Sequence, residues 1–246
     1  MACGYKGVGR LADLRKITER IGLLLKQRND LKGKRILVTA GATVEEIDPV
    51  RVITNKSSGK MGTSVAEQAF LRGADVILLR GHNSVESSYN IKEEKFTTVN
   101  DLYNKIKNKI KNIDVLIHAA AVSDFTINNK KGTKIKSNKE LYLELTPTTK
   151  IFEKLKKLNK KIFLAGFKAE HNVSEKRLVD SAYDILKKAN ADLVVANDVG
   201  KQGRGFDVDT NEVFVIDKNK KIEHIKLTDK RIVADKILDI IIDETK

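Results

Sequence analysis

Blocks of apolar and polar residues follow one another along the chain and predict strands and helices in alternation. Short apolar runs, typical of buried strands, lie at residues 35–41, 75–79, 114–122, 162–167 and 193–197. Stretches with apolar residues at helical spacing lie at residues 59–72, 101–112, 148–158 and 174–189. Strands that alternate with helices in this way predict a doubly wound, mostly parallel α/β fold with a Rossmann-like sheet.

Weaker patterns predict the edges of this sheet. Residues 95–99 form a candidate third strand, and residues 213–216 and 222–227 predict an antiparallel edge hairpin. A candidate half-buried strand has apolar residues at alternate positions, namely Leu141, Leu143 and Leu145. Either this strand or the hairpin could supply an edge at which two copies of the chain pair.

Three polar residues are candidate N-caps of helices, because their side chains can accept a hydrogen bond from a free N–H group of the first turn. These residues are Asn100, Ser174 and Thr228. The helix after Thr228 is the last one, and we expect it to end near Asp243.

Residues 1–33 differ from the rest of the chain. Residues 2–12 are glycine-rich and irregular, and a helix-like run follows at residues 14–31. We therefore predict a tail and a connecting helix, followed by one large domain at residues 34–246.

Composition narrows the class of protein. The chain has 246 residues, of which 41% are hydrophobic and 33% charged, as expected of a soluble globular protein. The net charge of +14 comes largely from lysines spread along predicted helix faces, and no aromatic RNA-binding motif is present, so we do not expect nucleic acid as a partner. No apolar run approaches the roughly 18–20 residues of a membrane span. With a single cysteine, Cys3, and no secretory leader, we expect a cytoplasmic protein without an internal disulfide.

Small residues gather where four of the predicted strands end. They lie at residues 40–43, 118–124, 165–170 and 195–199. Doubly wound sheets bind ligands beyond the carboxyl ends of their strands, and small residues let a ligand approach the backbone. Although small residues can also serve packing alone, four such stretches favour a nucleotide-sized cleft.

Two polar segments are candidates for contact with anions. Residues 57–62 lie where a helix begins, and free N–H groups there suit a phosphate, although the spacing fits neither a Walker A loop nor G-x-G-x-x-G. Arg51 and Asn55, just upstream, could hold a carboxylate and a carbonyl oxygen. The second segment, residues 128–139, carries several lysines and could close over a triphosphate, although a solvated loop would look the same.

Together these segments resemble the phosphopantothenate–cysteine ligases, also called phosphopantothenoylcysteine synthetases. The resemblance covers the chain from about Lys34 to the C-terminus. Its motifs lie at residues 40–43, 47–51, 55, 57–62, 119–124, 134–136, 166–167, 196–199, 205–206 and 211–212.

The resemblance implies a two-step reaction on the route to coenzyme A. The carboxylate of 4′-phosphopantothenate would attack the α-phosphate of a nucleotide and form an acyl-nucleotidyl intermediate with release of pyrophosphate. The amine of L-cysteine would then displace the nucleoside monophosphate. The resemblance also implies Mg²⁺, CTP more than ATP as the nucleotide, and a homodimer.

Site residues follow from the same resemblance. Asn55, Arg51 and Lys134 would act in catalysis. The phosphopantothenate or another anion would meet Ser57, Ser58, Gly59, Lys60 and Met61. The nucleotide would meet His118, Ala119, Ala120, Asp124, Lys134, Thr149, Lys150, Ile151, Phe152, Phe167 and Lys188. No metal ligands are assigned.

The segment ahead of the domain has a resemblance of its own. Residues 2–12 are similar to the end of phosphopantothenoylcysteine decarboxylase, an FMN enzyme that is fused ahead of the ligase in many relatives, and Cys3 falls on its catalytic cysteine. We therefore expect residues 1–33 to be a remnant of a decarboxylase domain, so that FMN would belong only to the missing part.

Two alternatives stay open on the sequence. An NAD(P)-dependent Rossmann-fold oxidoreductase often has a Tyr-x-x-x-Lys pair, and Tyr183 with Lys187 has that spacing, but no glycine-rich turn follows the first strand. A non-catalytic binding subunit is the second alternative, and the retention of Asn55 and Lys134 argues against it.

Overall fold

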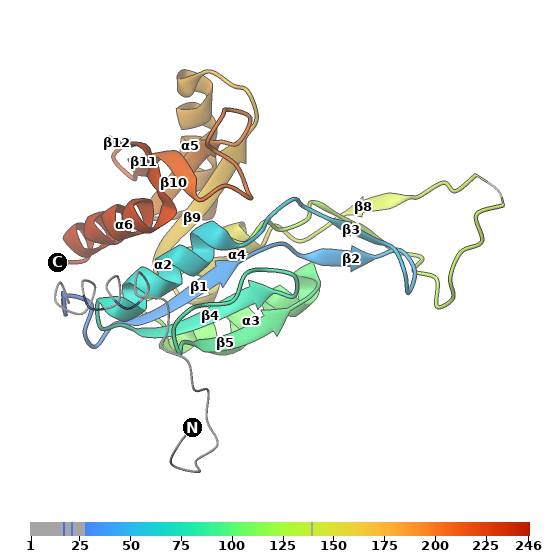
Figure 1. Cartoon of the computed structure of the whole chain (residues 1–246), viewed down its shortest axis with the longest axis horizontal. Helices are drawn as coiled ribbons and strands as arrows, with labels where there is room; N and C mark the ends of the chain where they lie inside the picture. Colours follow the sequence, from blue (N-terminus) through green and yellow to red (C-terminus); the bar gives the residue numbers. More distant parts are fainter. Residues whose placement is uncertain (1–16, 18–20, 22–27, 139) are drawn as a thin grey trace, which may run out of the picture.

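The computed structural model describes Ile17, Ile21, residues 28–138 and residues 140–246 (Figure 1). The predicted tail at residues 2–12 and most of the connecting helix at residues 14–31 lie outside the described residues, so their prediction stays open.

One large sheet organises the described chain. In spatial order its strands are β12 (Ile222–Asp229), β11 (Thr210–Asp217), β10 (Leu193–Asp198), β9 (Phe163–Glu170), β6 (Val115–His118), β1 (Arg35–Ala40), β4 (Asp75–Gly81) and β5 (Lys92–Phe96). The six strands from β10 to β5 pair in parallel, whereas β11 pairs antiparallel with β10 and with β12. The predicted mostly parallel α/β sheet with an antiparallel edge hairpin is therefore confirmed.

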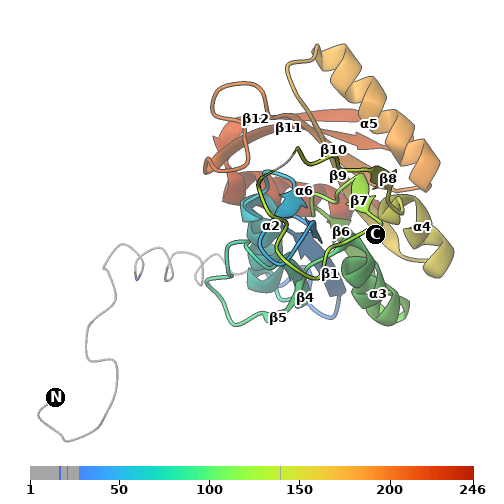
Figure 2. The same ribbon diagram turned by 90° about the vertical axis from the view of Figure 1, so that its right-hand side faces the viewer.

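Helices cover both faces of the sheet. The helices α2 (Lys60–Leu71) and α6 (Lys230–Glu244) pack on one face, with Ile36 and Val38 of β1. The helices α3 (Val99–Lys109), α4 (Ile151–Leu158) and α5 (Glu175–Ala189) pack on the other, with Leu37 (Figure 2). A short 3₁₀ helix, Ile110–Asn112, follows α3. Alternate residues of β1 thus enter two separate cores, which explains its unbroken apolar run. No helix among the described residues has both the length and the apolar character that a bilayer span requires.

An arm extends beyond the carboxyl end of β1 (Figure 1). It contains two antiparallel pairs, β2 (Val44–Glu46) with β3 (Val52–Thr54), and β7 (Phe125–Ile127) with β8 (Leu145–Pro147). A hydrogen bond from Thr126 Oγ1 to Glu45 Oε2, 2.6 Å long, joins the two pairs. The long loop predicted after β1 therefore contains a hairpin that its polar composition did not reveal.

The strand predicted around Leu141, Leu143 and Leu145 is wrong. Only Leu145 belongs to a strand, and the three leucines are 40–47% exposed. Alternation predicts a half-buried strand only where a second layer covers its apolar side. Here the segment lies on the arm, outside the helices that cover the large sheet.

Some predicted boundaries shift by a few residues. Thr98, not Asn100, caps α3 by accepting from Asp101 N–H, and Asp229, not Thr228, caps α6. The strand predicted at residues 95–99 ends at Phe96, because Thr98 already caps the next helix. Ser174 caps α5 as predicted.

An ion cluster around the buried Arg72 fixes the chain where it enters the sheet. The Arg72 guanidinium donates to both carboxylate oxygens of Asp30 at 3.0 and 2.8 Å, and it also contacts Asp235 and Asp239 of α6 at 2.9 and 2.8 Å. Leu31 is buried beside this cluster. The segment before β1 is thereby held against α2 and α6.

Candidate functional site

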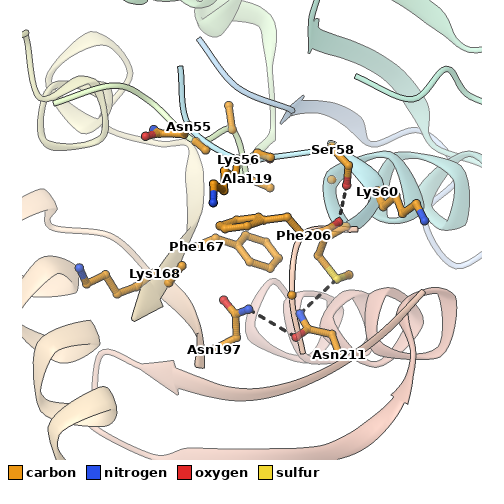
Figure 3. A pocket seen from close by; sticks show the side chains of 18 of the residues that line it. Asn55, Lys56, Ser58, Lys60, Ala119, Phe167, Lys168, Asn197, Phe206 and Asn211 are labelled. Carbon is orange, nitrogen blue, oxygen red and sulfur yellow. Dashed lines mark hydrogen bonds between the residues drawn. The ribbon is translucent and has the colours of Figure 1, made fainter. Parts of the chain in front are cut away.

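A pocket of about 550 Å³ lies at the carboxyl ends of β1, β6, β9 and β10 (Figure 3). Segments from both halves of the chain meet in it. Its lining consists of residues 55–62, 119–122, 124, 167–169, 197, 205, 206, 211 and 230. The position agrees with the predicted ligand edge of the sheet.

The loop before α2 forms one wall of the pocket. Gly59 has a φ of 80°, and a Cβ atom there would lie 2.8 Å from the Ser84 Cβ, so the turn needs glycine. No side chain caps α2, and its first turn holds no acidic residue. The first N–H groups of the helix are therefore open to an external anion.

A second loop is tied to this wall. Ser58 Oγ donates a hydrogen bond to the carbonyl oxygen of Phe206. Lys60 Nζ donates to the carbonyl oxygen of Asp207 and to Asp209 Oδ1, each at 2.7 Å. The Phe206 side chain thereby lies in the pocket beside Phe167 of β9 (Figure 3).

His118 lies beneath the opposite wall and not in the pocket lining. Its Nδ1 is 2.9 Å from Thr39 Oγ1, which also accepts a hydrogen bond from Ala120 N–H at 3.1 Å. Its ring stacks on Phe152 with centroids 6.0 Å apart. Burial lowers the pKa of His118 to about 4, so the imidazole is neutral at neutral pH. His118 thus supports the backbone at Ala119 and Ala120 from below.

The turn before α4 stays behind the pocket. The Phe152 ring occupies the space that a side chain at position 166 would need, since a Cβ on Gly166 would lie 2.2 Å from Phe152 Cζ. Ile151 is buried in the core. Lys150 Nζ forms an ion pair with Asp124 Oδ1 at 2.5 Å, and only Asp124 of this pair lines the pocket.

Arg51 latches the lysine-rich segment to the β2–β3 hairpin. Its guanidinium donates to Asp48 Oδ2 at 2.8 Å and to the carbonyl oxygen of Ile135 at 3.2 and 3.3 Å. Burial alone would raise the pKa of Asp48, but N–H donors of Ile135, Val50 and Arg51, together with the Arg51 charge, hold it below its usual range. Lys134, next to Ile135, is exposed and does not line the pocket.

Lys188 lies at the other edge of the sheet. It belongs to the last turn of α5, which ends just before β10 begins. A helix that connects two parallel strands runs back toward their amino ends, so its last turn lies far from the carboxyl edge. The pair Tyr183 and Lys187 also lies on α5, with Lys187 Nζ 4.9 Å from the Tyr183 ring centre, and neither lines the pocket.

The structure therefore brings together only part of the predicted site. The pocket lining contains Asn55, Ser57, Ser58, Gly59, Lys60, Met61, Ala119, Ala120, Asp124 and Phe167. The predicted residues outside the lining are Arg51, Lys134, His118, Thr149, Lys150, Ile151, Phe152 and Lys188. Their roles in binding or catalysis stay predictions.

Several lining residues were not predicted. The clearest are Lys56, Lys168, Asn197, Phe206, Asn211 and Lys230. Asn197 and Asn211 face each other on neighbouring strands, with Asn197 Nδ2 3.4 Å from Asn211 Oδ1. The motifs of the family resemblance include residues 196–199, 205–206 and 211–212. They could therefore have identified Asn197, Phe206 and Asn211. Lys230 had no such signal, because it is one lysine among many.

No group of three or more His, Cys, Asp or Glu side chains able to hold a metal ion occurs in the described residues. Asp124 is the carboxylate that the described pocket lining offers. Mg²⁺ at nucleotide sites is commonly held by one or two carboxylates together with substrate phosphates, and this donor set fits that pattern.

Residues 31–245 match the family model described as the DNA/pantothenate metabolism flavoprotein C-terminal domain. The chain belongs to this family. A family relative, the coenzyme A biosynthesis bifunctional protein CoaBC of Thermococcus kodakarensis, is 42% identical over 236 residues. The match spans 95% of this chain and 57% of that protein, so the chain spans little more than half the length of this relative.

Solved structures agree with the family. The crystal structure of the C-terminal domain of a CoaBC protein is similar with a TM-score of 0.74 and 33% identity, covering 88% of this chain and 98% of that one. A Cab2 variant in complex with phosphopantothenate-cysteine is similar with a TM-score of 0.72 and 21% identity, covering 96% and 94%. The second likeness shows the fold alone.

Proposed function

We propose that the chain is a phosphopantothenate–cysteine ligase of coenzyme A biosynthesis. The observation that carries this proposal is the composition of one pocket. An uncapped helix N-terminus with Lys60, the carboxamide of Asn55 and the small residues at Ala119 and Ala120 all line it. The name of the Thermococcus kodakarensis relative, which refers to coenzyme A biosynthesis, supports the same conclusion.

The proposed first step activates a carboxylate. A carboxylate oxygen of 4′-phosphopantothenate attacks the α-phosphorus of the nucleotide, a P–O bond forms, and the bond to the β-phosphate breaks with release of pyrophosphate. Ala119, Ala120, Asp124 and Phe167 would hold the nucleotide at the end of the pocket near β6 and β9. Mg²⁺, held by Asp124 and the phosphates, would neutralise charge on the phosphate oxygens.

In the proposed second step the amine of L-cysteine attacks the acyl carbon. A C–N bond forms, the acyl–oxygen bond breaks, the nucleoside monophosphate leaves, and the amine loses a proton. The anhydride is needed because a free carboxylate is a poor acyl donor. Asn55, which lines the pocket, would donate a hydrogen bond to the acyl oxygen (Figure 3).

Lys134 requires a movement of its segment in this scheme. It is exposed outside the pocket, on a segment that Arg51 holds at Ile135. We propose that the segment closes over the bound nucleotide, so that Lys134 neutralises the departing pyrophosphate and Arg51 approaches the acyl intermediate. CTP as the preferred nucleotide, a homodimer and a cytoplasmic location complete the proposal, and the resemblance supports them.

The test is pyrophosphate release. The protein is incubated with phosphopantothenate and Mg²⁺, with CTP or ATP, with and without cysteine. We expect pyrophosphate without cysteine and faster release with CTP. An Asn55→Asp variant should accumulate the acyl-nucleotide, because a carboxylate repels negative charge that develops on the acyl oxygen. Asn90→Asp, at an exposed site outside the pocket, is the matched control. No release with either nucleotide would overturn the ligase proposal.

A further inference from the structure

Three cationic side chains that stay charged at neutral pH are buried in the described part of the chain, and one of them differs from the others. Arg72 meets Asp30, Asp235 and Asp239, and Arg80 meets Glu86 and Glu93 at 2.5 and 2.6 Å. Lys230 is 4% exposed, and among the described residues its ammonium contacts carbonyl oxygens and no carboxylate. Buried charges normally have a counter-ion, so an unpaired one requires an explanation.

Lys230 lies at the first position of α6 and lines the pocket. Its ammonium donates to the carbonyl oxygens of Gly205 at 3.0 Å, Phe206 at 3.4 Å and Val208 at 2.6 Å. These carbonyls satisfy its donors, but neutral oxygens do not cancel its charge. Burial and the nearby charge of Lys60 lower the pKa of Lys230 to about 8, against the opposing effect of Asp209 and Asp207.

Positive charge therefore converges at one end of the pocket. Lys60 and Lys230 both line it, and the first turn of α2 adds the positive end of a helix without an acidic residue. Lys60 is paired with Asp209, whose side chain is 81% exposed, whereas Lys230 has no carboxylate partner among the described residues. A carboxylate of the protein could have neutralised Lys230. Because no described carboxylate does so, this end of the pocket is suited to an anionic ligand.

We propose that Lys230 is a substrate-binding residue, which with Lys60 and the first turn of α2 binds the phosphate monoester of the acyl substrate. This inference rests on the proposed function, since it takes 4′-phosphopantothenate as that substrate. The bound dianion supplies the counter-charge that Lys230 lacks among the described residues.

The position of the two lysines decides between the two phosphate-bearing substrates. Lys60 and Lys230 belong to α2 and α6, which cover one face of the sheet. Asp124 pairs with Lys150, just ahead of α4, which covers the other face. A pocket that holds two anionic substrates needs two separate phosphate sites, so the lysine pair takes the phosphate monoester and the Asp124 end takes the nucleotide.

The experiment compares a variant with a substrate that lacks the phosphate. Isothermal titration calorimetry measures the dissociation constants of phosphopantothenate and of pantothenate for the wild type and for Lys230→Met. Wild type should prefer phosphopantothenate, and the variant should lose about 10- to 100-fold of that preference, because a buried positive charge attracts a nearby dianion strongly in a medium of low dielectric. Pantothenate affinity should stay unchanged. Lys60→Met should act in the same direction, and Lys230→Arg should retain most of the preference.

The controls separate binding from a loosened loop. Lys236→Met removes the same charge from an exposed site on the same helix and should have no effect. If Lys230 only held the Gly205–Val208 carbonyls, Lys230→Met would weaken phosphopantothenate and pantothenate equally, which would overturn the inference. A selective loss of nucleotide affinity would overturn it too.

Failure of the proposed reaction can be distinguished from failure of the proposed phosphate site. If wild type binds phosphopantothenate more tightly than pantothenate but releases no pyrophosphate, the proposed reaction is wrong and the phosphate site stands. If Lys230→Met does not unfold cooperatively, Lys230→Arg and Lys60→Met carry the comparison, and an unchanged preference in Lys60→Met overturns the site.

Discussion

The imidazole of His118 is sealed under the wall of the pocket that Ala119 and Ala120 form. Its folded-state pKa of about 4 lies below the usual value of 6.5, so the unfolded chain binds a proton over a range in which the folded chain does not. Stability that is present above pH 6.5 is therefore lost as the pH falls toward 4.

This loss can be isolated with His118→Phe, which keeps an aromatic ring against Phe152 and removes the titration. Between pH 7 and pH 4.5 the free energy of unfolding, from urea denaturation, should fall by about 2 kcal/mol less in the variant than in the wild type. His171→Phe, which removes an exposed imidazole, is the matched control. Parallel curves for wild type and His118→Phe would contradict the burial of a neutral ring.

At the scale of residues, the sequence predicted which loops meet but not which way side chains point. Residues 57–61 and 119–120 were predicted from helix-start and strand-end patterns, and they line the pocket. His118 is the last residue of a strand that is buried on both faces, so its apolar neighbours do not indicate its direction. Lys230 could not be told from the other lysines because its burial results from packing of a distant loop.

At the scale of elements, the arm is held together by a few polar contacts. Asp48 is fully buried as a side chain and accepts from Arg51, and both residues bond to the backbone of Ile135. The lysine-rich segment should therefore open away from the hairpin more easily when this latch is removed.

Arg51→Met tests the latch. Loss of the bonds to Asp48 and Ile135 should speed tryptic cleavage at Lys130–Lys136 by about tenfold, as measured by mass spectrometry. The reason is that the free energy of local opening falls by roughly the contribution of one charged hydrogen bond. Pyrophosphate formation should slow as well. Arg177→Met, on the exposed surface of α5, should change neither rate. Unchanged cleavage in Arg51→Met would mean that Asp48 holds the segment without it.

Element predictions succeeded where periodicity reports burial and failed on the arm. Strands such as β1 and β10 enter two cores and read as apolar runs, whereas β2 and β3 are three residues long and carry almost no pattern. Leu141 and Leu143 have the alternating spacing of a half-buried strand, but no second layer of the described chain covers them. Short or uncovered elements of this kind leave little trace in hydrophobic spacing.

At the scale of the whole molecule, exposed apolar side chains concentrate on the arm. They are Val50, Val52, Phe125, Leu141, Tyr142, Leu143 and Leu145, with Tyr142 86% exposed. Such a surface commonly marks a protein–protein contact, and it supports the proposal that a second copy of the chain pairs there. The edge strand β12 offers the alternative surface.

Paired substitutions distinguish the two surfaces. We expect a dimer by light scattering, and Tyr142→Ser with Leu143→Ser should shift it toward monomer. Ile222→Ser with Leu227→Ser removes two apolar side chains that are 46% and 47% exposed on β12 and should leave the dimer intact. Dissociation by the β12 pair alone would place the contact at the sheet edge instead.

The Arg72 cluster also has a consequence for immobilising the protein on a solid support. Asp30 and Leu31 are fixed against α2 and α6 just before β1 begins, whereas the pocket lies beyond the end of that strand. A strand of six residues separates the two by about 20 Å. A protein tethered to a bead or sensor chip at Arg28 would therefore hold its pocket on the side of β1 opposite the anchor, open to ligand in the flow.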